Sequence, residues 1–251
     1  MGNSLNEEQV VKKIDMLTFK IVINKVKEFL DSKNEAVAIL QEIPFKCNID
    51  GFNEHILFSE FFEFFPDDKY VMLYNISSKS QIKMTVVLAK KMGLEELIYR
   101  KNNELNNNMC VSFGIKDLDL SIIGVHPHNA NELLKWLQVG GFPDIMLGDF
   151  NAGDYKKRCE DSMFKVNRDN YRKLISGYTD ICKGQMTRRT VFSNGFVYET
   201  PIDHVLIKNS SELTKKYQCK NVKIEINEDN VSDHYPIYFK LLCLDEADKS
   251  Q

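Results

Sequence analysis

Two kinds of hydrophobic spacing follow one another at the start of the chain. Between residues 7 and 31, apolar side chains recur at helical intervals, which predicts a long helix that ends at Asp31. Residues 36–40 (AVAIL) instead form a continuous apolar run, typical of a strand buried on both faces. We expect this strand to end at Gln41 and Glu42, in the position where the sites of α/β proteins collect.

Further strands and helices are predicted along the rest of the chain. Strand-like runs occupy residues 69–76, 83–91, 112–115, 120–126, 144–152, 190–195, 202–207 and 235–242. Helices are expected at residues 131–139 and in the segment that ends near Gly177. Tight turns require antiparallel pairs and interleaved helices require crossovers, so the pattern favours an α/β (α+β) fold with two mixed sheets in one domain, residues 1–251.

The composition restricts the class of protein. Hydrophobic residues make up 43% and charged residues 27%, the balance of a soluble globular chain, and the formal net charge of −3 argues against adhesion to nucleic acid through overall charge. No apolar run is long enough to span a bilayer, so we expect a cytoplasmic protein without membrane insertion. Its six cysteines include no C-x-x-C pair, which argues against a zinc site held by sulfur.

Several short segments place acids, amides or histidines at the ends of predicted strands. They are LQE (40–42), GVHPHN (124–129), GDFN (148–151), PIDH (201–204) and SDH (232–234). Each segment alone has an ordinary structural role, because acids end strands in turns, GDFN fits an Asx turn, and a histidine in a strand usually packs in the core. Together they supply what phosphodiester hydrolysis needs: cation ligands, a group that holds water, donors to phosphate and help for the leaving oxygen.

The chemistry of the side chains suggests a role for each group. The oxygen ligands Glu42 and Asp233 suit Mg²⁺, with Mn²⁺ as the alternative ion. Asp149 is suited to hold the attacking water while the amide of Asn151 donates to a phosphoryl oxygen.

The order of these segments resembles that of the endonuclease/exonuclease/phosphatase superfamily, the deoxyribonuclease-like hydrolases. The resemblance implies a four-layer α/β/β/α sandwich in which Asp203 pairs with the catalytic His234 and fixes its tautomer. It implies that Glu42 and Asp233 bind the metal, that Asp149 and Asn151 position water and phosphate, and that His126 assists the leaving group.

One element of that family has no counterpart in the sequence. Family members normally begin with a buried strand that ends in Trp-Asn or Phe-Asn, whereas nothing strand-like precedes the first predicted helix. We therefore expect the first strand to be missing or truncated, which keeps a noncatalytic binding module open as an alternative.

The favoured function is that of a nuclease or other phosphodiesterase, with a phosphodiester substrate, preferentially nucleic acid. Arg188 and Arg189 precede the PIDH strand and are either a phosphate clamp, with Arg189 assigned to the substrate, or a solvated pair. An inositol-phosphate or lipid phosphoesterase is the enzymatic alternative, although GDFNAG lacks the Tyr-Arg that follows GDFN in many inositol phosphatases. The phenylalanines between residues 58 and 65 are interpreted as packed in a core or an interface rather than as a base-stacking platform.

Overall fold

The computed structural model describes residues 16–48, 51–53, 56–76, 81–101, 107–153, 162–191, 193–226 and 232–244. The expectation that the family's first strand is missing or truncated concerns the residues before α2, and these lie outside the described residues. Contacts divide the chain into two compact units, Met1–His126 and Pro127–Gln251. The prediction of a single domain over residues 1–251 stays a prediction.

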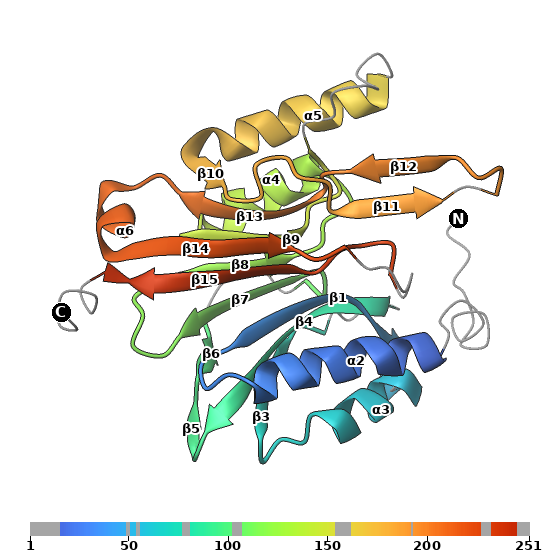
Figure 1. The fold of residues 1–251 in the computed structure, drawn as a ribbon, viewed down its shortest axis with the longest axis vertical. Coiled ribbons are helices and arrows are strands. Elements are labelled where there is room, and N and C mark those ends of the chain that lie inside the picture. Colours follow the sequence, from blue (N-terminus) through green and yellow to red (C-terminus); the bar gives the residue numbers. More distant parts are fainter. Residues whose placement is uncertain are drawn as a thin grey trace. The chain divides into compact units, whose positions relative to one another are not determined.

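The described residues of the first unit form two antiparallel sheets and two helices (Figure 1). Its elements are α2 (Met16–Asp31), β1 (Val37–Asn48), β2 (Gly51–Asn53), α3 (Ile56–Phe64), β3 (Tyr70–Tyr74), β4 (Gln81–Met92), β5 (Glu95–Glu96), β6 (Ile98–Arg100), β7 (Cys110–Ile115) and β8 (Ile122–Val125). One sheet has the order β2-β1-β4-β3, with β5 paired to β4, and the other places β7 between β6 and β8.

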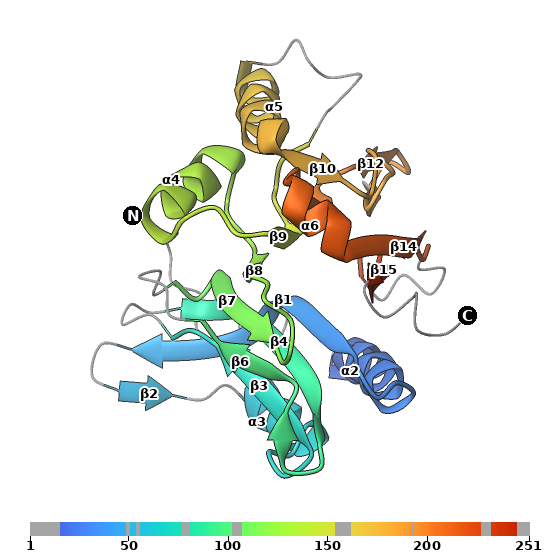
Figure 2. The ribbon, with the colours of Figure 1, turned by 90° about the vertical axis from the view of Figure 1, so that its left-hand side faces the viewer.

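The core of the first unit lies between α2, α3 and the sheet formed by β1, β3 and β4 (Figure 2). Phe58 is fully buried and packs edge to face on Phe45, with ring centroids 5.0 Å apart. Phe61, also in α3, and Phe65, directly after it, are equally buried, and their ring centroids lie 5.0 Å apart. The interpretation of these phenylalanines as core is confirmed, although the sequence did not predict that they form a helix.

Strand β1 differs from its predicted form in a way that matters for the site. It does not end after Leu40 but continues to Asn48, and its pairing with β4 is irregular between Leu40 and Ile43. Glu42 lies inside this bulge with a φ of 60°, a conformation that L-residues rarely adopt. The expectation that Glu42 stands at the end of its strand is therefore wrong, because a bulge and not a strand end turns it out of the ladder.

The second unit carries the remaining elements. They are α4 (Ala130–Gly140), β9 (Ile145–Asp149), α5 (Ser162–Leu174), the 3-10 turn η1 (Ile175–Gly177), β10 (Tyr178–Asp180), β11 (Arg188–Val191), β12 (Val197–Thr200), β13 (Asp203–Lys208), α6 (Ser211–Lys216), β14 (Tyr217–Ile224) and β15 (Ile237–Cys243). Strand β13 pairs with β10 on one side and with β9 on the other, while β11 with β12 and β14 with β15 form antiparallel pairs.

One predicted strand of this unit has the wrong boundaries. Residues 190–195 are not a single strand, since β11 ends at Val191 and the chain turns back into β12. Gly195 has a φ of 80° and the side chain of Asn194 accepts a hydrogen bond from the amide of Phe196. An Asn-Gly pair of this kind favours a hairpin turn, so the strand ends here although apolar residues precede the pair.

The interleaved helices and strands confirm the predicted α/β class. Among the described helices, none is long and apolar enough to cross a lipid bilayer.

Candidate functional site

The register of two strands places two carboxylates opposite each other. Asp149 is the last residue of β9 and pairs across the sheet with Asp203, the first residue of β13. Both are buried, with 5% and 8% of their surfaces exposed. Like charges directly opposite on paired strands repel, and the repulsion grows where water is excluded. This pair therefore requires a positive charge beside it.

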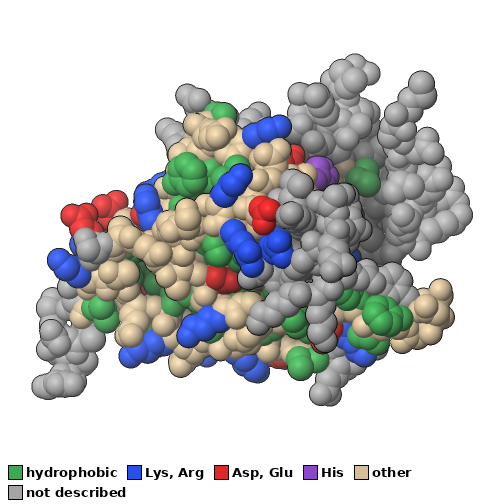
Figure 3. Space-filling model, turned by 90° about the horizontal axis from the view of Figure 1, so that it is seen from above, with side chains coloured by type: hydrophobic (Ala, Val, Ile, Leu, Met, Phe, Trp, Pro, Cys, Tyr) green, Lys and Arg blue, Asp and Glu red, His purple; other side chains and the backbone are tan. Residues whose placement is uncertain are grey.

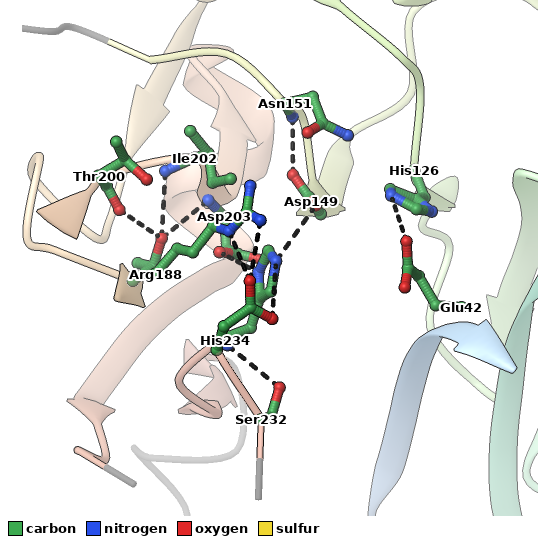
Figure 4. Close-up of polar contacts among 12 residues, drawn as sticks. Glu42, His126, Asp149, Asn151, Arg188, Thr200, Ile202, Asp203, Ser232 and His234 are labelled. Atoms are coloured by element: carbon green, nitrogen blue, oxygen red, sulfur yellow. Dashed lines mark hydrogen bonds and ion pairs between the residues drawn. The ribbon is translucent and has the colours of Figure 1, made fainter. Parts of the chain in front are cut away.

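His234 supplies that charge from the segment that precedes β15 (Figure 4). Its Nδ1 lies 2.9 and 3.0 Å from the carboxylate oxygens of Asp203, and its Nε2 lies 3.8 Å from Oδ2 of Asp149. The backbone amide of His234 donates to Oγ of Ser232. The predicted pairing of Asp203 with His234 is what the geometry shows, and the Nε2 end of the ring is turned toward Asp149.

The cluster shifts the pKa values of two of its members. Burial, together with the charge of Asp203, raises the pKa of Asp149 to about 7, although His234, the Asn151 amide and Arg188 oppose the rise. Burial alone would lower the pKa of His234, but the hydrogen bond and charge of Asp203, with the charges of Asp149 and Asp233, outweigh it and raise the pKa to about 9. At neutral pH the ring is therefore an imidazolium beside a carboxyl group that titrates.

Asn151 belongs to the turn that follows β9. It has a φ of 46°, and its backbone amide donates a hydrogen bond of 2.7 Å to Oδ1 of Asp149. Its side-chain Nδ2 donates to the carbonyl of Pro127 at 2.9 Å. This is the Asx turn that the GDFN sequence suggested, and it fixes the Asp149 carboxylate.

Asp233 lies beside the same cluster and has an arginine partner. Nε and Nη2 of Arg188 each lie 2.8 Å from Oδ2 of Asp233, and Oδ1 of Asp233 lies 3.9 Å from Nε2 of His234. Arg189 uses its backbone amide to donate to the Asp233 carbonyl. The geometry brings the guanidinium of Arg188, and not that of Arg189, to the acidic cluster. Because neighbours on a strand point to opposite faces, only one of the two can do so.

A buried hydroxyl that the sequence analysis overlooked supports this arrangement. Oγ1 of Thr187 accepts hydrogen bonds from the amides of Ile202 and Asp203, at 3.1 and 2.9 Å. The side chain is fully buried. A threonine just before an arginine pair has no sequence signal for this role, because the role depends on two strands that meet only in the fold.

His204 lies on the opposite face of β13 from Asp203 and belongs to a second polar group. Its Nε2 donates to the carbonyl of Ala152 at 2.7 Å, while Nδ1 lies 2.9 Å from the Tyr171 hydroxyl and 3.0 Å from Oδ2 of Asp180. Burial would raise the pKa of Asp180, but the hydrogen bond and charge of His204 lower it below its ordinary value. His204 therefore connects Ala152, the residue after Asn151, to Asp180 at the end of β10.

The two predicted residues of the first unit lie near each other within that unit. Nε2 of His126 is 3.8 Å from Oε1 of Glu42, and Lys83 on β4 forms an ion pair with Oε2 of the same carboxylate. Gly124 lets β8 approach β1, because a Cβ there would lie 2.9 Å from a methyl carbon of Ile39. His126, which directly follows β8, is thereby brought to Glu42.

The donor atoms fit a divalent cation in part of this arrangement. Carboxylate oxygens of Asp149 and Asp203 lie within 4.8 Å of each other and are the kind of ligand that Mg²⁺ prefers, whereas His234, as an imidazolium, has no lone pair to offer. Glu42 in the first unit is a further carboxylate, with 53% of its side chain exposed. Arg188 already binds the Asp233 carboxylate, so a cation at Asp233 would either displace the guanidinium or share the carboxylate with it.

Comparison with known proteins identifies the fold. Neither a family model nor a curated protein matches the sequence. Among solved structures, the chain is similar to the endonuclease domain of TRAS1, a telomere-specific non-LTR retrotransposon, with 13% identity, a TM-score of 0.56 and coverage of 92% of this chain and 94% of that one. It is similar to an endonuclease/exonuclease/phosphatase from Bacteroides vulgatus, with 15% identity, a TM-score of 0.54 and coverage of 90% and 91%.

A third similar structure is a mannosyl-6-phosphatase of Bacteroides thetaiotaomicron VPI-5482, with 13% identity, a TM-score of 0.52 and coverage of 89% and 91%. These likenesses extend over most of the chain. The resemblance and the fold class predicted from the motifs are therefore confirmed: the chain has the endonuclease/exonuclease/phosphatase fold.

Proposed function

We propose that this chain, which has the endonuclease/exonuclease/phosphatase fold, is a metal-dependent phosphoesterase that cleaves phosphodiester bonds. The observation that carries the proposal is the cluster of Asp149, Asp203 and His234, in which two buried carboxylates hold an imidazolium. The structures that share the fold include an endonuclease and a phosphatase, so the fold is compatible with this chemistry.

The roles follow from the geometry of the second unit. Asp203 holds the Nδ1 proton of His234 and so directs the Nε2 proton toward the bound phosphate. Asp149, whose pKa is raised to about 7, accepts the proton of the attacking water. Asn151 holds the Asp149 carboxylate through its backbone, and its side-chain Nδ2, which donates one hydrogen to Pro127, contributes the other to a phosphoryl oxygen.

Arg188, in place of Arg189, is the arginine that we assign to the substrate, because its guanidinium and not that of Arg189 lies at the acidic cluster. Its guanidinium already binds a carboxylate oxygen of Asp233 next to His234, and a planar guanidinium binds phosphate oxygens in the same way. His126 in the first unit is proposed to assist the leaving oxygen, as the motif order implies.

We propose Mg²⁺, or Mn²⁺ as the alternative, as the cofactor. Glu42 and Asp233 are the ligands that the motifs imply, and Asp149 and Asp203 are further oxygen donors in the second unit. When bound, the cation neutralises phosphate charge and lowers the pKa of a coordinated water.

The substrate class is proposed to be nucleic acid. A small or lipid phosphoester is the second candidate, since a mannosyl-6-phosphatase has the same fold. A binding module without turnover is the third, because Glu42 and Asp233 are each paired with a basic side chain, Lys83 and Arg188.

The test is hydrolysis of a panel that contains single- and double-stranded DNA, RNA, inositol phosphates and bis-p-nitrophenyl phosphate, with Mg²⁺ or with EDTA. We expect metal-dependent cleavage that His234→Ala abolishes. A wild-type protein that is folded and cleaves none of these substrates would overturn the proposal in favour of the binding module.

A further inference from the structure

The outward face of the β14–β15 pair carries a row of basic side chains. Lys220 on β14 lies directly opposite Lys240 on β15, and Lys223 lies opposite Tyr238. All three lysines are exposed, whereas the alternate pair of Cys219 and Leu241 on the other face is half-buried. Lys240 and Tyr238 are two residues apart on β15 and share one face, and the irregularity of β14 between Lys220 and Lys223 keeps their two partners on that same face, which is open to solvent.

The Lys220–Lys240 pair lowers the stability of the protein when no anion is bound. Like charges directly opposite on antiparallel strands destabilise the pair. Lys223 has an acid beside it, with Nζ 3.1 Å from Oε2 of Glu225. Within the part of the chain that the structure describes, no ion pair is formed by Lys220 or Lys240. A polyanion that lies along this face would relieve the repulsion.

The row extends away from His234 within the same unit. Lys240 lies six residues after His234, a separation of at most about 20 Å along the chain. It also lies three residues into β15, about 10 Å along the strand from Ile237. A single phosphate group held at His234 does not cover that length, but a nucleic acid strand, with one charge about every 3.4 Å of helix axis, does.

We propose that Lys220 and Lys240, with Lys223 beside them, bind the phosphate backbone of a nucleic acid strand whose scissile phosphate is held at His234. The inference rests on the proposed function and names its substrate class. An anionic membrane is disfavoured as the partner, because the most exposed side chains of this face are lysines and Gln218 rather than apolar groups that enter a bilayer. Figure 3 shows one face of the molecule, on which the described Lys and Arg side chains are more widespread than Asp and Glu; the lysine row itself is placed by the strand register.

The experiment uses the full chain with the double substitution Lys220→Glu and Lys240→Glu. Fluorescence anisotropy in EDTA measures the Kd for a labelled single-stranded oligonucleotide at several salt concentrations. We expect the double variant to bind at least about tenfold more weakly, and the slope of log K against log salt to become shallower by about 1.4, the change for two lost phosphate contacts on a single strand.

A matched control separates a local effect from a change of overall charge. Lys33→Glu with Lys69→Glu alters two exposed lysines of the first unit, and either double variant changes the formal net charge from −3 to −3 − 4 = −7. We expect the control to bind the oligonucleotide within about twofold of the wild type.

Hydrolysis of bis-p-nitrophenyl phosphate is the second readout, since this small substrate does not reach the lysine row. We expect equal rates for the wild type and for Lys220→Glu/Lys240→Glu. Two results would overturn the inference even if the small substrate is cleaved. One is that the wild type does not bind the oligonucleotide, and the other is that the double variant and the control bind it with equal Kd. Failure of the wild type to cleave the small substrate would instead overturn the proposed function, and the binding result would still decide the role of the row.

Two further measurements test whether unfolding or membrane binding accounts for the loss of affinity. If the double variant unfolds, Lys220→Gln/Lys240→Gln removes the charges without reversing them, and the same decrease in the slope of log K against log salt is expected.

Binding to vesicles that contain anionic phospholipid is measured in parallel. A loss that affects the vesicles and spares the oligonucleotide would assign the row to a membrane surface and overturn the inference.

Discussion

Asp149 and His234 hold their protons more tightly in the folded chain than in the unfolded chain. For Asp149 the folded pKa is about 7 against an ordinary 3.8, and for His234 about 9 against 6.5. A group of either kind stabilises the folded state most below its unfolded pKa, and that stabilisation falls as the pH rises through the folded value. The cluster therefore makes the metal-free protein less stable toward alkaline pH.

The first prediction is that Asp149→Asn reverses part of this trend. Asn carries no charge to repel Asp203, so the variant should gain stability over the wild type as the pH rises from 3.8 to about 7. The gain is expected to be a few kcal/mol at most, because a tenfold difference in proton affinity between the folded and unfolded chains corresponds to roughly 1.4 kcal/mol. Urea unfolding in EDTA at several pH values measures it, and a difference between the two proteins that does not change with pH would contradict the prediction.

The second prediction concerns the pairing of His234 with Asp203. Asp203→Asn removes the largest influence that raises the pKa of His234, so that pKa should fall from about 9 toward or below its ordinary 6.5. NMR titration of the His234 ring measures the value directly. Hydrolysis should fall at least about a hundredfold at neutral pH, because the ring then no longer donates a proton. A ring that still titrates near 9 would show that Asp203 does not hold it.

Sequence reasoning found the chemical groups but not all of their partners. Asp149, Asn151, Asp203 and His234 were assigned from their positions at strand ends, and the structure brings these four together in the second unit. The role of Arg188 depends on which face of β11 meets the segment before β15, and that is a property of the pairing between distant segments.

Two residues outside the acidic cluster, Thr187 and Gly153, hold the start of β13 by close contacts. Thr187 satisfies the two backbone amides at the start of β13, and Gly153 lies against the carbonyl of Pro201, where a Cβ would be only 2.0 Å away. Such contacts fix where β13 begins, and with it the position of Asp203.

The third prediction tests the threonine. Thr187→Val leaves the amides of Ile202 and Asp203 buried without an acceptor, at a cost of about 1–3 kcal/mol in the free energy of unfolding. Thr190→Val, in β11 directly after Thr187 and the arginine pair and only half-buried, is the matched control and should cost less than about 0.5 kcal/mol. Chemical denaturation of both variants checks this, and equal losses would remove Thr187 from the support of the site.

The fourth prediction tests the glycine. Gly153→Ala should lower the melting temperature and the hydrolysis rate together, because the Pro201 carbonyl is backbone and moves only with the strand that carries Asp203. Gly177→Ala, where a Cβ meets nothing within 4 Å, should change neither. Unchanged activity in the Gly153 variant would show that the segment yields without moving the site.

The elements show where sequence reasoning succeeds and where it stops. Continuous apolar runs located β3, β4, β9 and β13, because burial alone selects those residues. Strand β14 was missed, since its residues (YQCKNVKI) alternate polar and half-buried side chains with little apolar content. Its pairing with β15 is what makes it a strand.

For the whole molecule, cation binding is expected to stabilise the fold. The fifth prediction is that Mg²⁺ raises the melting temperature of the wild type, because an ion that binds only the folded state adds to its stability by mass action. The increase should shrink in Asp149→Asn, which loses a carboxylate of the acidic cluster. Differential scanning fluorimetry with and without EDTA measures it, and an equal increase in both proteins would contradict a role for Asp149 in binding the ion.

The likeness of fold covers nine-tenths of the chain at 12 to 15% identity, so the fold is maintained by the pattern of burial and not by particular residues. A catalytic role cannot be inferred from such a likeness. It depends on the cluster of Asp149, Asp203 and His234 and on the residues that hold this cluster in place.

The alternation of Asp203 and His204 along β13 also determines which changes of chain length the protein can tolerate. Asp203 serves His234 on one face, while His204 serves Ala152 on the other. Deletion or insertion of one residue in this strand would exchange their directions and disable both groups at once. Variation in chain length is therefore expected to accumulate in the Asn194–Gly195 turn and to be excluded from residues 201–208.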